Sequence, residues 1–199
     1  MLNLTCNIMK RVILKSALVT VGALTAIGIL IFSLWILISP QSMATVSEKI
    51  GNYSFAVTCA DLKYKYSGKT EDLARCAEDG ILSGDDGLIV KYCQPLIEKQ
   101  DFEKLCIDKN EELSQGAFGI YRLDYESFIL GNLAASQYRE GDLLKAVETC
   151  SKGEYRCYNR LVIAVAESRS AEDLETLKSA PSDLGAKEYV NGLIALFVK

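Results

Sequence analysis

Cysteine thiols are the side chains whose type and spacing point most directly to chemistry in this sequence. Six of the seven cysteines come after residue 58, and an even number of cysteines is typical of disulfide pairing where the compartment permits oxidation. They are Cys59, Cys76, Cys93, Cys106, Cys150 and Cys157. No two of them form a Cys-x-x-Cys pair, so their spacing does not indicate zinc and we expect no metal site.

Other kinds of catalytic or cofactor chemistry have little support. The chain contains no histidine, which removes Ser–His and Cys–His couples and imidazole metal ligands. Asp85-Asp86-Gly87 lacks the alternating oxygen ligands and terminal glutamate of a calcium loop, so we interpret it as a helix cap and turn. With no phosphate-binding or dinucleotide glycine motif, we expect no cofactor and no enzymatic activity. A hydrolase that uses paired carboxylates is the least favoured alternative.

An apolar segment near the N-terminus determines how the rest of the chain is attached to a membrane. The stretch from Ser16 to Ser47 is uncharged, and its core, Ala17–Ser39, would be about 34 Å long as a helix, enough to cross a bilayer. The sequence predicts a short cytoplasmic N-terminus (1–15), one transmembrane helix (16–40) and an external helical domain (41–199).

The orientation follows from the charges that flank this segment. Lys10, Arg11 and Lys15 precede it and no acid does, so the positive-inside rule keeps the N-terminus in the cytoplasm and places the C-terminal domain outside the cell membrane. The alternative is a cleaved signal peptide, because Ser42-Met43-Ala44 has a small-x-small form. The apolar stretch is longer than a signal peptide needs, which favours a retained anchor.

The composition of the remaining chain limits its partners. Residues 48–199 contain 19 Lys and Arg and 26 Asp and Glu, a net charge near −7. An acidic domain of this kind is a poor binder of nucleic acid or anionic lipid surfaces. About 150 residues can bury one adequate core.

Amphipathic stretches separated by short Gly, Asp, Ser and Lys turns predict an all-α domain. Thr70 and Ser170 precede acidic first turns and are expected to be helix N-caps. Short turns make neighbouring helices antiparallel. We expect helices near 41–49, 52–66, 70–82, 86–99, 101–110, 120–139, 142–151, 154–168, 171–179 and 183–198.

Antiparallel hairpins also suggest how the cysteines pair. The two members of each pair lie at similar distances from an intervening turn, which places them level on adjacent helices. The expected pairs are Cys59–Cys76, Cys93–Cys106 and Cys150–Cys157. The alternative is that all six are buried thiols, because level positions do not make side chains face each other.

Several segments recur at a spacing of about 34 residues, such as Cys59-Ala-Asp-Leu62 and Cys93-Gln-Pro-Leu96. Asn132-Leu133-Ala134, the Gly141-Asp142 turn and Ala146 are similar to the consensus of the tetratricopeptide repeat, a helical hairpin of that length. The family's tryptophan and closing proline are absent. The resemblance implies an antiparallel α-hairpin solenoid over about residues 51–198, although a generic helical-hairpin stack would give a similar pattern.

This resemblance also implies a binding groove lined by the first helix of each hairpin. Its residues would be Phe55, Thr58, Lys65, Tyr66, Phe128, Tyr138 and Arg139, where aromatic rings beside cations would suit an extended peptide or a partner helix. Phe55 and Phe128 could instead be core residues. The sequence thus favours a membrane-tethered scaffold or adaptor that binds another protein. The alternative is a structural subunit that uses its transmembrane helix as the main interface.

Overall fold

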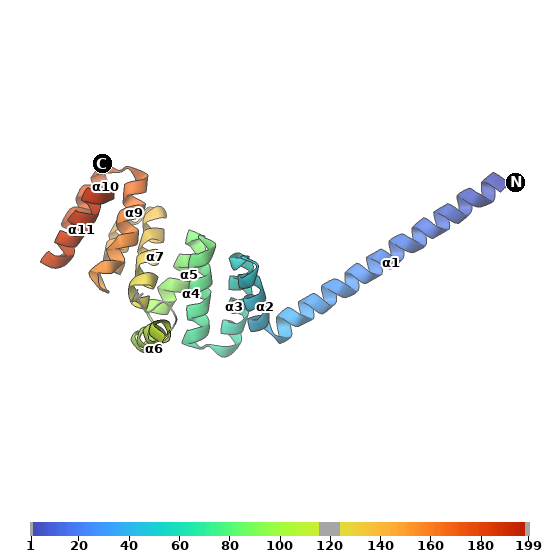
Figure 1. The fold of residues 1–199 in the computed structure, drawn as a ribbon, viewed down its shortest axis with the longest axis horizontal. Helices are drawn as coiled ribbons and strands as arrows, with labels where there is room; N and C mark the ends of the chain where they lie inside the picture. Colours follow the sequence, from blue (N-terminus) through green and yellow to red (C-terminus); the bar gives the residue numbers. More distant parts are fainter. Residues whose placement is uncertain (1, 116–123, 198–199) are drawn as a thin grey trace.

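The computed structural model describes residues 2–115 and 124–197, with side chains over residues 15–112 and 124–197. These residues form eleven α-helices and one short 3₁₀ helix, η1, and they contain no strand (Figure 1). The predicted all-α fold class is therefore confirmed. The elements are α1 Leu2–Ile38, α2 Pro40–Lys49, α3 Tyr53–Ser67, α4 Thr70–Ser83, α5 Asp86–Ile97, α6 Phe102–Gln115, α7 Tyr125–Arg139, α8 Leu143–Ser151, η1 Tyr155–Cys157, α9 Tyr158–Ser168, α10 Ala171–Ser179 and α11 Leu184–Phe197.

The long helix α1 contains the predicted apolar segment. Its stretch Lys15–Ile38 is long and apolar enough to cross a membrane, and its most apolar part is not buried by the rest of the chain. α1 extends away from all the other helices (Figure 1). It ends two residues before the predicted boundary at 40 because Ser39 is the N-cap of the next helix and Pro40 is the first residue of α2. Proline suits that position, where a backbone N–H would have no helical partner.

Short polar turns end most of the helices, as the sequence predicts. The Asp85 side chain accepts a hydrogen bond from the Leu88 backbone N–H at 3.0 Å, and Ser170 caps α10 in the same way. Gly68 follows α3 in the left-handed region, which glycine enters at little cost. The prediction for Thr70 is wrong. Lys69 occupies the N-cap of α4, while the Thr70 hydroxyl donates to Asp101 at 2.7 Å.

The helices after α1 form an elongated stack (Figure 1). α3 packs between α2 and α4, α4 packs on α5, and α5, α7, α9 and α11 contact one another in chain order. Helices α3, α5, α7 and α9 begin at residues 53, 86, 125 and 158, so the two-helix unit recurs at 33 to 39 residues, close to the predicted period. This arrangement is a stack of helical pairs. Its assignment to the tetratricopeptide class stays a prediction.

Several predicted boundaries differ from the structure. α6 extends to Gln115 rather than 110, and the predicted helix 154–168 is divided into η1 and α9. The predicted helix 120–139 corresponds to α7, which begins at Tyr125. Its first expected residues, 120–123, lie outside the described part of the chain.

Helix α7 joins the two main hydrophobic clusters of the stack. Ile129 and Leu133 belong to the cluster formed with α3, α4, α5 and α6, whereas Leu130 and Ala134 belong to the cluster formed with α8, η1, α9, α10 and α11. The helix is buried on both sides for this reason. Its close approach to η1 depends on Gly131, where an added Cβ would lie 3.0 Å from the Cys157 carbonyl oxygen.

Candidate functional site

The predicted groove residues on α3 lie at the surface. Thr58, Lys65 and Tyr66 are all exposed, and 71% of the Tyr66 surface is accessible to solvent. Lys65 forms an ion pair with Asp61, one helical turn earlier, at 2.7 Å. The charge of Asp61 also acts on Lys91 of α5, so these two side chains lie near each other.

Two lysines lie against tyrosine rings in this part of the molecule. The Lys99 Nζ lies 5.7 Å from the centre of the Tyr64 ring. The Lys91 Nζ lies 4.6 Å from the centre of the buried Tyr92 ring and donates a hydrogen bond to its hydroxyl at 2.8 Å. We refer to the following residues as the cation–aromatic face: Tyr64, Lys65, Lys91 and Lys99.

The two predicted groove phenylalanines contact other parts of the chain. Phe55 is half-buried and stacks on Phe32 of α1, with ring centres 6.2 Å apart and planes inclined by 13°. Phe128 packs against the first hydrophobic cluster, and its ring lies 6.3 Å from that of Tyr125. Both side chains therefore contribute to packing.

Tyr138 and Arg139, at the end of α7, connect it to neighbouring helices. The Tyr138 hydroxyl donates to Asp173 of α10 at 2.8 Å and also bonds to Ser168 of α9 at 2.5 Å. Arg139 donates to Asp86 at the start of α5 at 3.0 Å. The seven predicted residues thus do not form one cluster. Thr58, Lys65 and Tyr66 are exposed at the surface of α3, whereas the other four contact neighbouring helices.

A buried acid that the sequence analysis did not identify connects α2 with α4. Arg75 donates to Glu48 from Nε at 2.9 Å and to Thr45 from Nη2 at 2.7 Å. Asp79 lies one turn after Arg75 and is only 3% exposed. Its carboxyl group lies close enough to Glu48 to feel that charge, and its Oδ2 atom has no hydrogen-bond partner among the described residues.

Burial changes the acidity of this group. The pKa of Asp79 is raised from 3.8 to about 7, mainly by loss of hydration and then by the nearby charge of Glu48, while the charge of Arg75 lowers it. The adjacent acids Glu78 and Asp79 gave no sequence signal for this environment, because such a pair on a helix is typical of a solvent-facing surface. The buried environment of Asp79 arises only because α2 packs on the stack.

A polar surface pocket of about 370 Å³ lies between the start of α4 and α6. It contains carboxylates and ammonium groups with a single leucine, which suits water or small polar solutes better than an apolar ligand. The residues that line it are Thr70, Glu71, Asp101, Lys104, Leu105, Asp108, Lys109 and Glu112.

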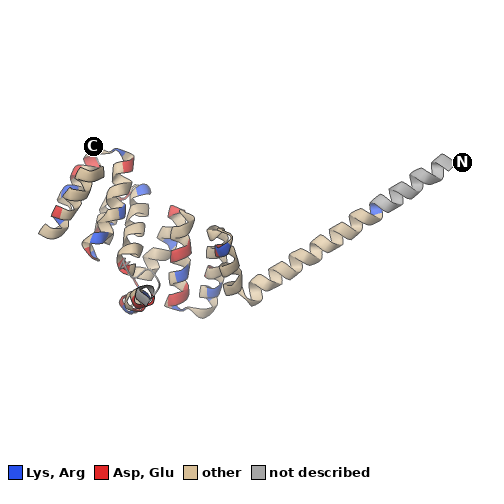
Figure 2. Cartoon of the chain, viewed as in Figure 1, with Lys and Arg blue, Asp and Glu red and all other residues tan. Residues whose placement is uncertain are grey.

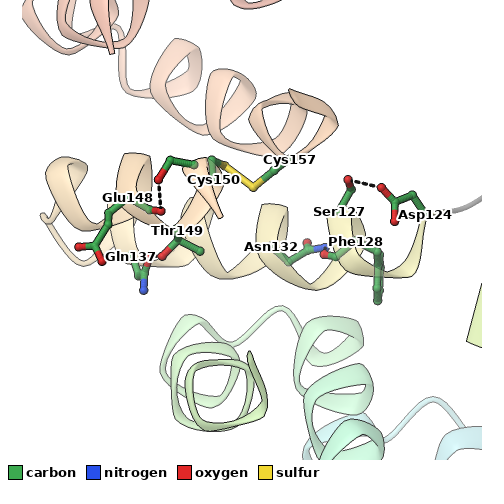
Figure 3. The surroundings of a disulfide bond; sticks show 10 residues. Asp124, Ser127, Phe128, Asn132, Gln137, Glu148, Thr149, Cys150 and Cys157 are labelled. Carbon is green, nitrogen blue, oxygen red and sulfur yellow. Dashed lines mark hydrogen bonds between the residues drawn. A yellow bond between two sulfur atoms is a disulfide. The ribbon is translucent and has the colours of Figure 1, made fainter. Parts of the chain in front are cut away.

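One of the predicted disulfides is present. Cys150 at the end of α8 is bonded to Cys157 of η1, with their Cα atoms 5.3 Å apart (Figure 3). Both half-cystines are buried in the second hydrophobic cluster. The bond closes the turn between α8 and η1, as the positions of these cysteines around Gly153 predicted.

The other two predicted pairs, Cys59–Cys76 and Cys93–Cys106, are not formed in the structure, where all four are buried free thiols. Cys59 faces Met43 and Ala44 of α2, whereas Cys76 belongs to the larger cluster around α4. Cys93 and Cys106 share a cluster, but α6 packs on α7 and α4 rather than level with α5. Burial raises the pKa of Cys76, Cys93 and Cys106 to about 12, which keeps these thiols protonated at neutral pH.

Comparisons with protein-family models, with curated proteins and with solved structures find no match to this chain. The tetratricopeptide resemblance therefore rests on the residues quoted for it, together with the recurring helical pairs.

Proposed function

We propose that this protein is a membrane-tethered scaffold or adaptor that binds another protein outside the cytoplasm. The observation that carries the proposal is the cation–aromatic face, which is formed by α3, α5 and the turn after α5. Its half-buried tyrosine and its lysines lie on a preformed helical stack, so binding would require little ordering of the backbone.

The chemistry of this face favours an acidic partner. Within the described residues, Lys91 and Lys99 form no ion pair and are positioned against tyrosine rings instead. Tyrosine and cationic side chains are enriched at the centres of protein interfaces. An acidic peptide segment or helix would meet both lysines as well as Tyr64, on a domain that otherwise carries a negative net charge.

Site-specific photo-crosslinking in the native membrane tests this proposal. A photoreactive amino acid in place of the exposed Lys65 should give a discrete crosslinked product, and charge reversal with Lys91→Glu and Lys99→Glu should remove it. Lys145→Glu, an exposed change on α8, is the matched control and should leave the product intact. A product that survives both reversals, or the absence of any product at position 65, would contradict binding at this face.

A structural subunit of a membrane complex is the second candidate function, because no residue in the most apolar part of α1 is buried by the rest of the chain. The two candidates differ in what they need from α1. Replacing residues 16–31 with an unrelated apolar helix keeps Phe32 and the contacts after it. Complex formation should survive this exchange if the cation–aromatic face binds the partner, and should be lost if α1 is the interface.

A further inference from the structure

The junction between α1 and the stack is packed rather than open. Phe32 of α1 stacks on Phe55 of α3, and Ile36 packs on the small cluster that contains Met43 and Cys59. The Trp35 indole N–H also donates to the Ser42 hydroxyl at 3.3 Å. Side chains from two turns of α1 therefore hold the first helical pair of the stack against the end of the apolar segment.

This packing sets the depth of the stack relative to a bilayer. Lys15–Ile38 spans 24 residues, or about 36 Å, against a hydrocarbon core of about 30 Å. Phe32 precedes the end of α1 by six residues, about 9 Å, so it lies inside the apolar layer when that segment is centred. Because Phe55 stacks on Phe32, the start of α3 lies beside the membrane-spanning part of α1, at the level of the lipid headgroups.

The turn between α2 and α3 lies immediately before Phe55. Ile50 in this turn is 73% exposed, and it is followed by Gly51, Asn52 and the half-buried Tyr53. Val46, one turn earlier on α2, is also exposed. The turn thus presents apolar and uncharged side chains, with Lys49 as the adjacent cation, next to the membrane helix.

We propose that the α2–α3 turn is a second membrane contact, with Ile50 inserted into the headgroup region of the leaflet that α1 leaves. The occupant of this surface is the phospholipid bilayer itself, because the turn continues the apolar surface of α1. The contact would fix the stack at one orientation above the membrane. The inference rests on the proposed membrane tether but not on the identity of the protein partner.

Tryptophan fluorescence gives a direct test, since Trp35 is the only tryptophan in the chain. The full-length protein is reconstituted in phosphatidylcholine vesicles that contain lipids with a nitroxide quencher near the headgroup. Trp35→Phe combined with Ile50→Trp is expected to lose fluorescence on addition of the quencher lipid. The matched control combines Trp35→Phe with Tyr66→Trp, an equally exposed site at the other end of α3, and is expected to retain its fluorescence.

The fluorescence of Trp35 in the parent protein distinguishes failure of the turn contact from failure of the membrane tether. Quenching of Trp35 in the parent together with no quenching at position 50 would overturn the proposed turn contact and leave the tether intact. If Trp35 itself is not quenched, the tether fails and the turn contact fails with it. Equal quenching at positions 50 and 66 would also overturn the proposal, because the contact would then not be specific to the turn. Circular dichroism of each variant confirms that the helices remain folded.

Discussion

At the scale of single residues, Asp79 departs most clearly from its ordinary chemistry. It is a carboxyl group under α2, beside Glu48 and one turn from Arg75, with one oxygen unpartnered among the described side chains. A buried carboxylate without full pairing is costly, so the folded protein favours the protonated form. The contact between α2 and α4 therefore depends on a proton as well as on the Arg75–Glu48 ion pair.

Stability is expected to change with pH because of this group. The folded protein binds the Asp79 proton more tightly than the unfolded chain, whose carboxyl group has a pKa near 3.8. The free energy of unfolding contributed by Asp79 is therefore largest below pH 4, falls as the pH rises towards about 7, and is constant above that. Asp79→Asn should remove this slope and raise the melting temperature at pH 8, as measured by circular dichroism of the detergent-solubilised protein.

Glu71→Gln on the same helix is the control for this experiment. Glu71 is exposed, so its replacement should leave the pH profile of the parent unchanged. A lower melting temperature for Asp79→Asn than for the parent at pH 8 would contradict the interpretation, because it would mean that the charged form stabilises the fold.

At the scale of elements, the disulfide compensates for a weak helix. α8 has nine residues, too few to be stable alone, and its end is tied to η1 through Cys150 and Cys157. Closing a loop of seven residues is worth about 2 kcal/mol in the chain-entropy model. The bond also keeps the turn at Gly153 beside α7, where Leu130 fills the space that a side chain at 153 would need.

Removing this bond should lower stability measurably. The double variant Cys150→Ala and Cys157→Ala is expected to lose about 2 kcal/mol of unfolding free energy, read from chemical denaturation followed by circular dichroism. Reductant should lower the stability of the parent towards that of the variant and leave the variant itself unaffected. Alkylation of all six cysteines that follow residue 58 in the unreduced, denatured parent would contradict the presence of the bond.

The elements differ in how well the sequence predicted them. α4 and α10 agree with prediction to within one residue, because each lies between turns of glycine, serine or proline that stop a helix. Asp85 was correctly predicted as a cap for the same local reason. The missed features depend on contacts between helices. α6 lies against α7 and α4 rather than beside α5, which explains why Cys93 and Cys106 are not bonded. The role of Phe55 depends on α1, which the hairpin pattern could not reveal.

At the scale of the whole molecule, the charged residues lie mostly on the helical stack, whereas the described part of α1 beyond Lys15 carries none (Figure 2). The apolar α1 and the disulfide in the stack are consistent with a membrane or extracytoplasmic location. The orientation is a prediction from Lys10, Arg11 and Lys15. Alkaline phosphatase fused after Lys199 is expected to be active, and green fluorescent protein at the same position to be dark. An inactive phosphatase with a bright fluorescent fusion would reverse the orientation.

The central position of α7 has a consequence for the order of events during synthesis. The first hydrophobic cluster includes Tyr125, Ile129 and Leu133, so the N-terminal half of the stack cannot complete its core until α7 has left the ribosome. Domains generally begin to fold from the N-terminal side as they emerge. In this protein the core of the N-terminal half closes only when the middle of the chain is available, so we expect α2 to α6 to keep an exposed apolar side until that point of synthesis.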